Sequence, residues 1–171
     1  VQAISGQSAA EVAQLGSSAQ KLSVKYGMSL DNVTNGLITL GRAGISNAAT
    51  QSGVLEEGFK MAKLEGIDLN TALEDLITTT NLLSQTNVDM NSPEYITQVK
   101  EMNTKLLTAS QIAPIDVNDV IESLQYSGGS AAASHMDTDN LLATISAMGA
   151  RGTKGSLAGT ALRNFMTRDI T

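Results

Sequence analysis

The chain has 171 residues, which suits one globular domain or two small lobes, and it carries a formal net charge of −6 at pH 7. This acidic balance argues against electrostatic binding of nucleic acid, and an aromatic content of 3% argues against platforms that stack single-stranded bases. The sequence contains no cysteine, so disulfide frameworks and thiolate metal sites are excluded.

The first predicted element is an amphipathic helix over Ser8–Tyr26. Its apolar residues recur at spacings of three and four, and Gly27 follows as a stop. The residues before it resemble no signal peptide, and no apolar run approaches the roughly 18 residues of a membrane-spanning helix. Because the chain begins without Met and stops at Thr171, just after a predicted helix, we expect a piece of a longer protein.

A short helix-start pattern occurs four times along the chain. Each copy places an apolar residue, then a Ser or Asp suited to the N-cap, then a second apolar residue four positions after the cap. The cap satisfies free backbone N–H groups, and the two apolar residues pack together as a hydrophobic staple. The pattern predicts helix starts at Ser29, Asp68, Asp116 and Asp137.

Weaker signals mark three further helix starts and two helix ends. The starts are Ser46, the Ser92–Pro93 pair, in which Pro93 suits the first helical position, and Ser156. Two stretches combine an Arg with a final Gly, which is typical of a helix C-terminus: Leu40–Gly44 and Met148–Gly152.

The spacing of these starts predicts the fold class. The starts are roughly 17 to 24 residues apart, about one helix and one short turn. Alternation of apolar and polar residues over strand lengths is nearly absent. We therefore predict an all-α fold of about seven helices, arranged as consecutive antiparallel hairpins. The hairpins either stack in a short solenoid-like array or gather in a bundle whose helices merely share good caps.

The expected domain organisation is a single all-helical core domain over residues 1–171. Within it, residues 1–85 and 111–171 are possible sub-lobes, and residues 86–110 are an inserted helical connector. The stretch Gly128–Ser134 has two interpretations. It is either a flexible linker or a continuation of the helix that begins at Asp116, with small residues where another backbone comes close.

No convergent set of polar groups points to catalysis. His135 is the single histidine, and a His-based triad or metal site needs partners, whereas the nearby Asp137 already serves as an N-cap. The stretch Arg151–Ser156 suits either an anion or a plain turn, and it lacks the residue order of a phosphate loop. We expect a structural role for His135 and a non-enzymatic chain without cofactor or metal.

The most informative stretch is the predicted last helix, which follows a turn containing Gly152 and Gly155. Its apolar residues form two parallel rows that together predict one broad apolar face: Leu157, Ala161 and Phe165, and Ala158, Leu162 and Met166. Gly159 and the polar residues fill the other side, and the small residues Ala158, Gly159 and Ala161 would let another helix approach closely.

Two polar residues of this helix, Arg163 and Asn164, lie within its most distinctive stretch. We expect Arg163 to reach carbonyl groups or a carboxylate of the preceding helix, Met136–Gly149, and so to lock the pair. The alternative is a plain exposed face.

The stretch Gly155-Ser-Leu-Ala-Gly-Thr-Ala-Leu-Arg-Asn-Phe-Met166 closely resembles a signature of phage tail tape measure proteins, the family typified by lactococcal phage TP901. The family signature reads Gly-Ser-x-Ala-Gly-Thr-Ala-Leu-Arg-Asn. Met28–Gly44 and Tyr126–Ala133 support the resemblance, which runs from about Ala19 to the end, whereas Thr86–Ser110 fits less well and looks like an insertion. The signature marks these residues as a structural or interaction motif: Gly155, Ser156, Ala158, Gly159, Ala161, Leu162, Arg163 and Asn164.

The resemblance implies a structural component of the virion tail, assembled in the host cytoplasm. In that family the full-length protein lies extended along the tail lumen and sets tail length, so this chain would be a folded core module within it. The implied partners are the tail tube protein, baseplate or tail-tip proteins, tail assembly chaperones and further copies of the chain. The alternative is an unrelated helical-repeat adaptor that binds a peptide or partner helix in a groove.

Overall fold

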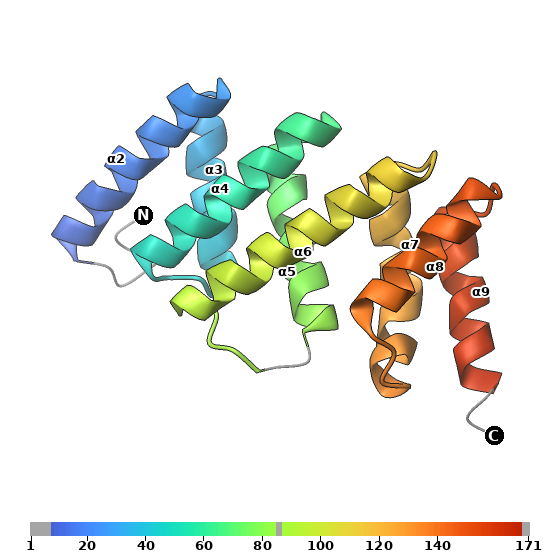
Figure 1. Cartoon of the computed structure of the whole chain (residues 1–171). Coiled ribbons are helices and arrows are strands. Elements are labelled where there is room, and N and C mark those ends of the chain that lie inside the picture. The colour runs from blue at the N-terminus through green and yellow to red at the C-terminus, as the bar shows by residue number, and fades with distance from the viewer. Residues whose placement is uncertain (1–7, 85–86, 169–171) are drawn as a thin grey trace. The chain divides into compact units, whose positions relative to one another are not determined.

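The structure is a computed structural model that describes residues 8–84 and 87–168, apart from the side chain of Glu11. The described part forms eight helices and no strand, which confirms the all-α class, although the sequence predicted about seven helices. The residues considered for a signal peptide lie outside this part. The helices are α2 (Ala9–Tyr26), α3 (Leu30–Arg42), α4 (Ala48–Glu65), α5 (Leu69–Leu83), α6 (Pro93–Ile112), α7 (Val117–Ala133), α8 (Thr138–Ala150) and α9 (Gly155–Arg168) (Figure 1).

The four strong helix starts are confirmed as N-caps. In each case the cap oxygen accepts a hydrogen bond from a backbone N–H of the first helical turn, at 2.8–3.2 Å. The donors to Ser29, Asp68, Asp116 and Asp137 are the N–H groups of Asn32, Asn70, Asp119 and Asp139.

One turn recurs at the ends of α2, α3, α4, α7 and α8. A residue with positive φ follows the helix, and the N–H after it donates to the carbonyl five positions earlier, at 2.9–3.1 Å. The positive-φ residues are Gly27, Gly44, Gly66, His135 and Gly152. In three of these turns the next two residues are the staple and N-cap of the following helix, so three residues end one helix and begin another.

The predicted start at Ser46 is wrong by one residue. Asn47 is the N-cap of α4, and its side chain accepts from the N–H groups of Ala49 and Thr50. The backbone N–H groups of Ser46 and Asn47 instead donate to the Asn91 side-chain oxygen, at 2.6 and 2.9 Å, and the Asn91 amide donates to the Gly44 carbonyl at 3.1 Å. Asn91 therefore holds the α3–α4 turn against the segment that leads into α6.

The described helices divide into two compact units, and the divisions fall inside α5 and α6. One unit holds α2, α3 and α4 with residues 69–77 of α5 and 93–101 of α6. The other holds the rest of α5 and α6 with α7, α8 and α9. The sub-lobes and connector expected from the sequence stay a prediction.

Within each unit, a helix contacts the helix two positions along the chain. In the first unit α2 lies beside α4, and Gly36 of α3 faces Leu73 of α5. In the second unit α7 lies beside α9, and the Ser146 hydroxyl of α8 donates to the Ala109 carbonyl of α6 at 3.3 Å. This contact pattern is that of stacked hairpins, so within each unit the structure favours stacking over a bundle.

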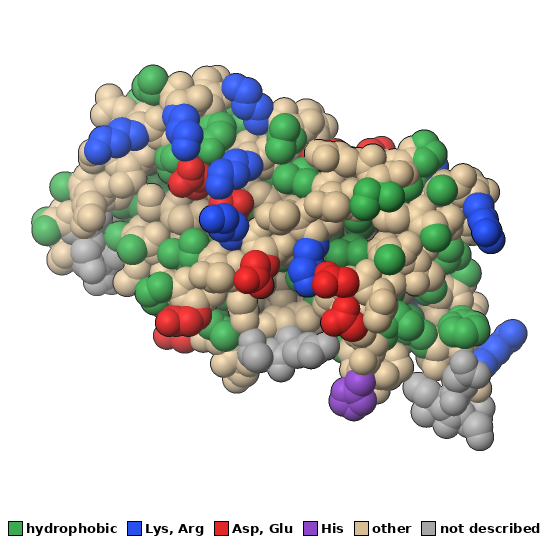
Figure 2. Space-filling view, in the orientation of Figure 1, with side chains coloured by type: hydrophobic (Ala, Val, Ile, Leu, Met, Phe, Trp, Pro, Cys, Tyr) green, Lys and Arg blue, Asp and Glu red, His purple; other side chains and the backbone are tan. Residues whose placement is uncertain are grey.

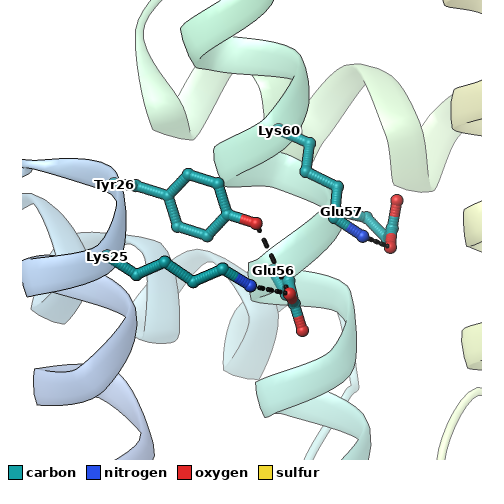
Figure 3. A network of polar contacts seen from close by, with 5 residues as sticks. All are labelled: Lys25, Tyr26, Glu56, Glu57 and Lys60. Atoms are coloured by element: carbon teal, nitrogen blue, oxygen red, sulfur yellow. Dashed lines mark hydrogen bonds and ion pairs between the residues drawn. The ribbon is translucent and has the colours of Figure 1, made fainter.

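A polar network joins α2 and α4 in the first unit (Figure 3). The Lys25 ammonium and the Tyr26 hydroxyl donate to one carboxylate oxygen of Glu56, at 2.8 and 3.4 Å. The hydrogen bond from Lys25 holds the pKa of Glu56 below its ordinary value, although desolvation opposes the shift. The exposed ion pair contributes little to stability, whereas the stack of Tyr26 on Phe59, with ring centroids 5.3 Å apart, buries apolar area.

The stretch Gly128–Ala133 belongs to α7, which confirms the helical interpretation over the flexible linker. Gly128 is buried because the Leu82 side chain of α5 lies where a Cβ would stand, 2.6 Å from Leu82 Cδ2. The small residue therefore admits a neighbouring side chain at this position.

We predict that His135→Gly stabilises the protein by about 1 kcal/mol, because His135 has a φ of 55°, which a side chain disfavours. Urea unfolding measures the change. His135→Ala is the control, since it removes the imidazole but keeps Cβ, and it should give no such gain. Equal stabilisation by both variants would assign the effect to the imidazole instead.

We predict that Asn91→Ala lowers the free energy of unfolding by about 2 kcal/mol, because it leaves two backbone N–H groups and one carbonyl without their partner. Asn91→Asp should retain much of the stability, since its carboxylate still accepts at the start of α4. Thermal unfolding compares the variants, and an unchanged melting temperature for Asn91→Ala would contradict the role assigned to this side chain.

Candidate functional site

The signature helix α9 packs on α7 at very short range. A Cβ added at Gly159 would stand 2.5 Å from the Ser123 carbonyl oxygen and 2.7 Å from Tyr126 Cβ. Ala158 beside it is fully buried, with 0% exposure, and Leu162 is also buried. Only glycine fits at position 159, so the approach of the two helices depends on this residue.

Polar contacts fix the turn that precedes α9. The Ser123 hydroxyl of α7 shares its proton between two carbonyl oxygens, that of Gly155 at 2.9 Å and that of Asp119 at 2.8 Å. The Lys154 ammonium donates to the Pro114 carbonyl and stands 3.8 Å from a carboxylate oxygen of Asp119. A Cβ at Gly155 would run into the Glu122 carboxylate.

These contacts decide between the two interpretations of Arg151–Ser156. Two carboxylates, those of Asp119 and Glu122, lie beside Gly155, and a bound anion there would be repelled. The stretch consists of the turn between α8 and α9 and the first two residues of α9, and its contacts tie it to the start of α7.

Three details of the predicted motif need correction. Ser156 is not the N-cap, because α9 already begins at Gly155. Gly159 lies in the contact with α7, not on the polar side. Ala161, expected to admit another helix, is exposed instead.

The predicted broad apolar face is split into two halves. The row Ala158, Leu162 and Met166 is buried. The other row is exposed, with Leu157 72% and Phe165 64% accessible, and we call Leu157, Ala161 and Phe165 the outer row. Interior packing on α7 uses only one side of α9, so about half of the signature's apolar surface has no role in the core of this unit.

Arg163 does not make the predicted contact with α8. Arg163 and Asn164 are both exposed, and the Arg163 side chain makes no hydrogen bond or ion pair within the described part of the chain. Both residues flank the outer row, as in the alternative of a plain exposed face.

A second feature of the same unit is an apolar groove of about 440 Å³ between α6 and α8, which we call the α6–α8 groove. One wall includes Ile112, which is 73% exposed. The other wall includes Ala143, Ala147 and Ala150. Lys105 and Asp139 also line the groove and form an ion pair at 2.7 Å. In Figure 2 acidic side chains gather near the start of α8, and the surface beyond them is mostly uncharged.

Sequence reasoning missed this groove, although part of its signal is visible. Exposed alanines recur at positions 143, 147 and 150, a helical spacing that gives one flat face. The α6 wall could not be assigned to it, because pairing of α6 with α8 is a tertiary contact.

His135 is exposed in the α7–α8 turn, where its backbone completes the helix end. Among residues 8–84 and 87–168, no group of three or more His, Cys, Asp or Glu side chains could hold a metal ion. In the same residues, no helix is both long and apolar enough to cross a membrane.

Each described unit consists of stacked helical hairpins, and the second unit carries an exposed apolar row on α9 and an apolar groove between α6 and α8. A model of the family described as phage-related minor tail protein matches residues 16–169, so the chain belongs to that family. It is therefore a structural component of a phage tail. Comparison with curated proteins and with solved structures gave no match.

We predict that Gly159→Ala lowers the free energy of unfolding by about 1–3 kcal/mol, because the new methyl group would collide with the α7 backbone. Gly129→Ala in α7 is the matched control. Its Cβ meets nothing within 4 Å, so it should raise the free energy of unfolding by about 0.5–1 kcal/mol through helix propensity. Chemical denaturation measures both, and equal effects would show that the α7–α9 contact is not tight.

Proposed function

We propose that this chain is the folded core module of a tape measure protein, the tail component that sets tail length. The observation that carries the proposal is that the residues of the signature in α9 fall into two sets, one packed on α7 and one exposed. Its inner residues Gly155, Ala158 and Gly159 are required by the contact with α7, whereas the outer row is left exposed. Membership of the minor tail protein family over residues 16–169 supports the same assignment.

The rise per residue of a helix determines which part of such a protein can set a length. A continuous helix advances about 1.5 Å per residue, so the length of an extended helical segment translates linearly into distance. Hairpins fold the chain back on itself and give little distance per residue. The module would therefore anchor or nucleate assembly, and the distance would come from extended segments of a longer protein.

The proposed role is non-enzymatic and needs no cofactor, and it is exercised through contacts. The expected partners are the tail tube protein, baseplate or tail-tip proteins and tail assembly chaperones, with further copies of the chain. Exposed apolar side chains such as Leu157 and Phe165 are suited to such contacts, because a surface row of large apolar residues gains free energy when a partner covers it.

A second candidate is a helical-repeat adaptor that binds a peptide or partner helix. The α6–α8 groove favours it, since an apolar channel between two helices is a typical seat for an amphipathic helix. In this case the groove would take a foreign helix and tail length would not depend on the protein.

We predict that tails shorten by about 1.5 Å per residue when a known number of residues is deleted from an extended helical segment of the phage protein that carries this module. Electron microscopy of purified particles measures the length. The control replaces the same segment with an unrelated helical sequence of equal length and should leave tail length unchanged. Tails of unaltered length after the deletion would reject the tape measure proposal and favour the adaptor.

A further inference from the structure

The second unit presents two complementary apolar features on different helices. The outer row of α9 is a ridge of Leu157, Ala161 and Phe165. The α6–α8 groove is a hollow of about 440 Å³ whose α8 wall includes three alanines. A ridge and a groove on the same unit allow one copy of the chain to fit a second copy.

The two features match in length and shape. From Leu157 to Phe165 the ridge spans about 12 Å of helix, and from Asp139 to Ala150 the groove wall spans about 16 Å. The ridge side chains recur at i and i+4, which is one of the rows that fit between neighbouring helices. Exposed alanines such as Ala147 let the backbone of an incoming helix come close.

Charge distinguishes two ways in which copies can pair. The charged residues of α9 in the described part of the chain are both cations, Arg163 and Arg168, although the chain as a whole is acidic. A symmetric contact of α9 with α9 would bring these cations together and is disfavoured. The start of α8 instead offers Asp137 and Asp139. Among the residues that line the groove, Lys105 is the cation, and it pairs with Asp139, so the carboxylate of Asp137 leaves a net negative charge there.

We propose that the outer row of one copy inserts into the α6–α8 groove of a second copy, with the α9 cations toward the acidic start of α8. The two contacting surfaces differ, so a pair keeps one unused groove on the copy that inserts its ridge and one unused ridge on the copy that receives it. Association therefore proceeds head to tail, into a ring or an open chain. The inference rests on the self-association included in the proposed function and specifies its surfaces.

The expected strength follows from the size of the contact. One ridge of three side chains in a shallow groove is smaller than a standard protein–protein interface, so isolated modules should associate weakly. Assembly would be strengthened where several copies are held together in one particle, because the effective concentration is then high.

Sedimentation of the purified chain over a range up to several hundred micromolar tests the proposal with two variants. Phe165→Glu replaces the largest apolar side chain of the ridge with an acid, and Ala147→Arg fills the groove and adds a repelling cation. Both positions are exposed, so neither change disturbs the core. Leu64→Glu, at a residue equally exposed on α4, and Ala13→Arg on α2 are the matched controls.

The wild type and both controls should show a mass that rises with concentration, and each of the two variants alone should stay monomeric. An equimolar mixture of Phe165→Glu and Ala147→Arg should form a dimer and stop there, because only one intact ridge and one intact groove meet. A monomeric wild type, or a mixture that fails to dimerise, would overturn the proposal. Tail length is measured on phage particles, whereas association is measured on the purified chain. The tape measure proposal and the proposal of the ridge–groove contact can therefore fail independently.

Discussion

The architecture depends on a three-residue reversal that one residue with positive φ makes possible. Gly27, Gly66 and His135 each end a helix in the left-handed conformation, and the staple and cap of the next helix follow at once. Because so short a connection leaves no slack, the following helix must run back along the one before it. Neighbours two positions apart then lie side by side, as α2 with α4 and α7 with α9 do.

Glycine contributes to packing as much as to turns. Gly36 and Gly58 lie inside α3 and α4, where they weaken helix propensity, yet both face Leu73. Gly149 likewise admits Ile115, and Gly159 admits the α7 backbone. With an aromatic content of 3%, the chain has few large side chains to fill wide gaps, so close helix approach is the way to a dense core.

Helix starts could be predicted from the sequence because capping is local chemistry. Ser29, Asp68, Asp116 and Asp137 bind N–H groups two or three residues away, and nothing distant competes with them. The start at Ser46 failed for the opposite reason, since Asn91, 45 residues away, binds its N–H. Local sequence gives no sign of such a partner.

The candidate site shows the same limit on a larger scale. Periodicity placed both apolar rows of α9 on one face, but whether a row is buried depends on which helices pack beside it. Because α7 covers only the side with Ala158 and Gly159, the row with Leu157 and Phe165 is exposed. The groove beside Ala147 could not be predicted from the sequence either, because two different helices, α6 and α8, form it.

The stacking of hairpins also determines how such a module can unfold locally. Within each unit a helix contacts its neighbours one and two positions along the chain, so the stability of the unit is roughly a sum of neighbour terms. Loss of one such contact then opens one helix without opening the whole unit. At α9 that contact is held by Gly159 against the α7 backbone and by the Ser123 hydroxyl on the Gly155 carbonyl. In the described structure α9 has several close contacts with α7 and α8 only, so the α7–α9 contact decides whether this helix stays packed on the unit.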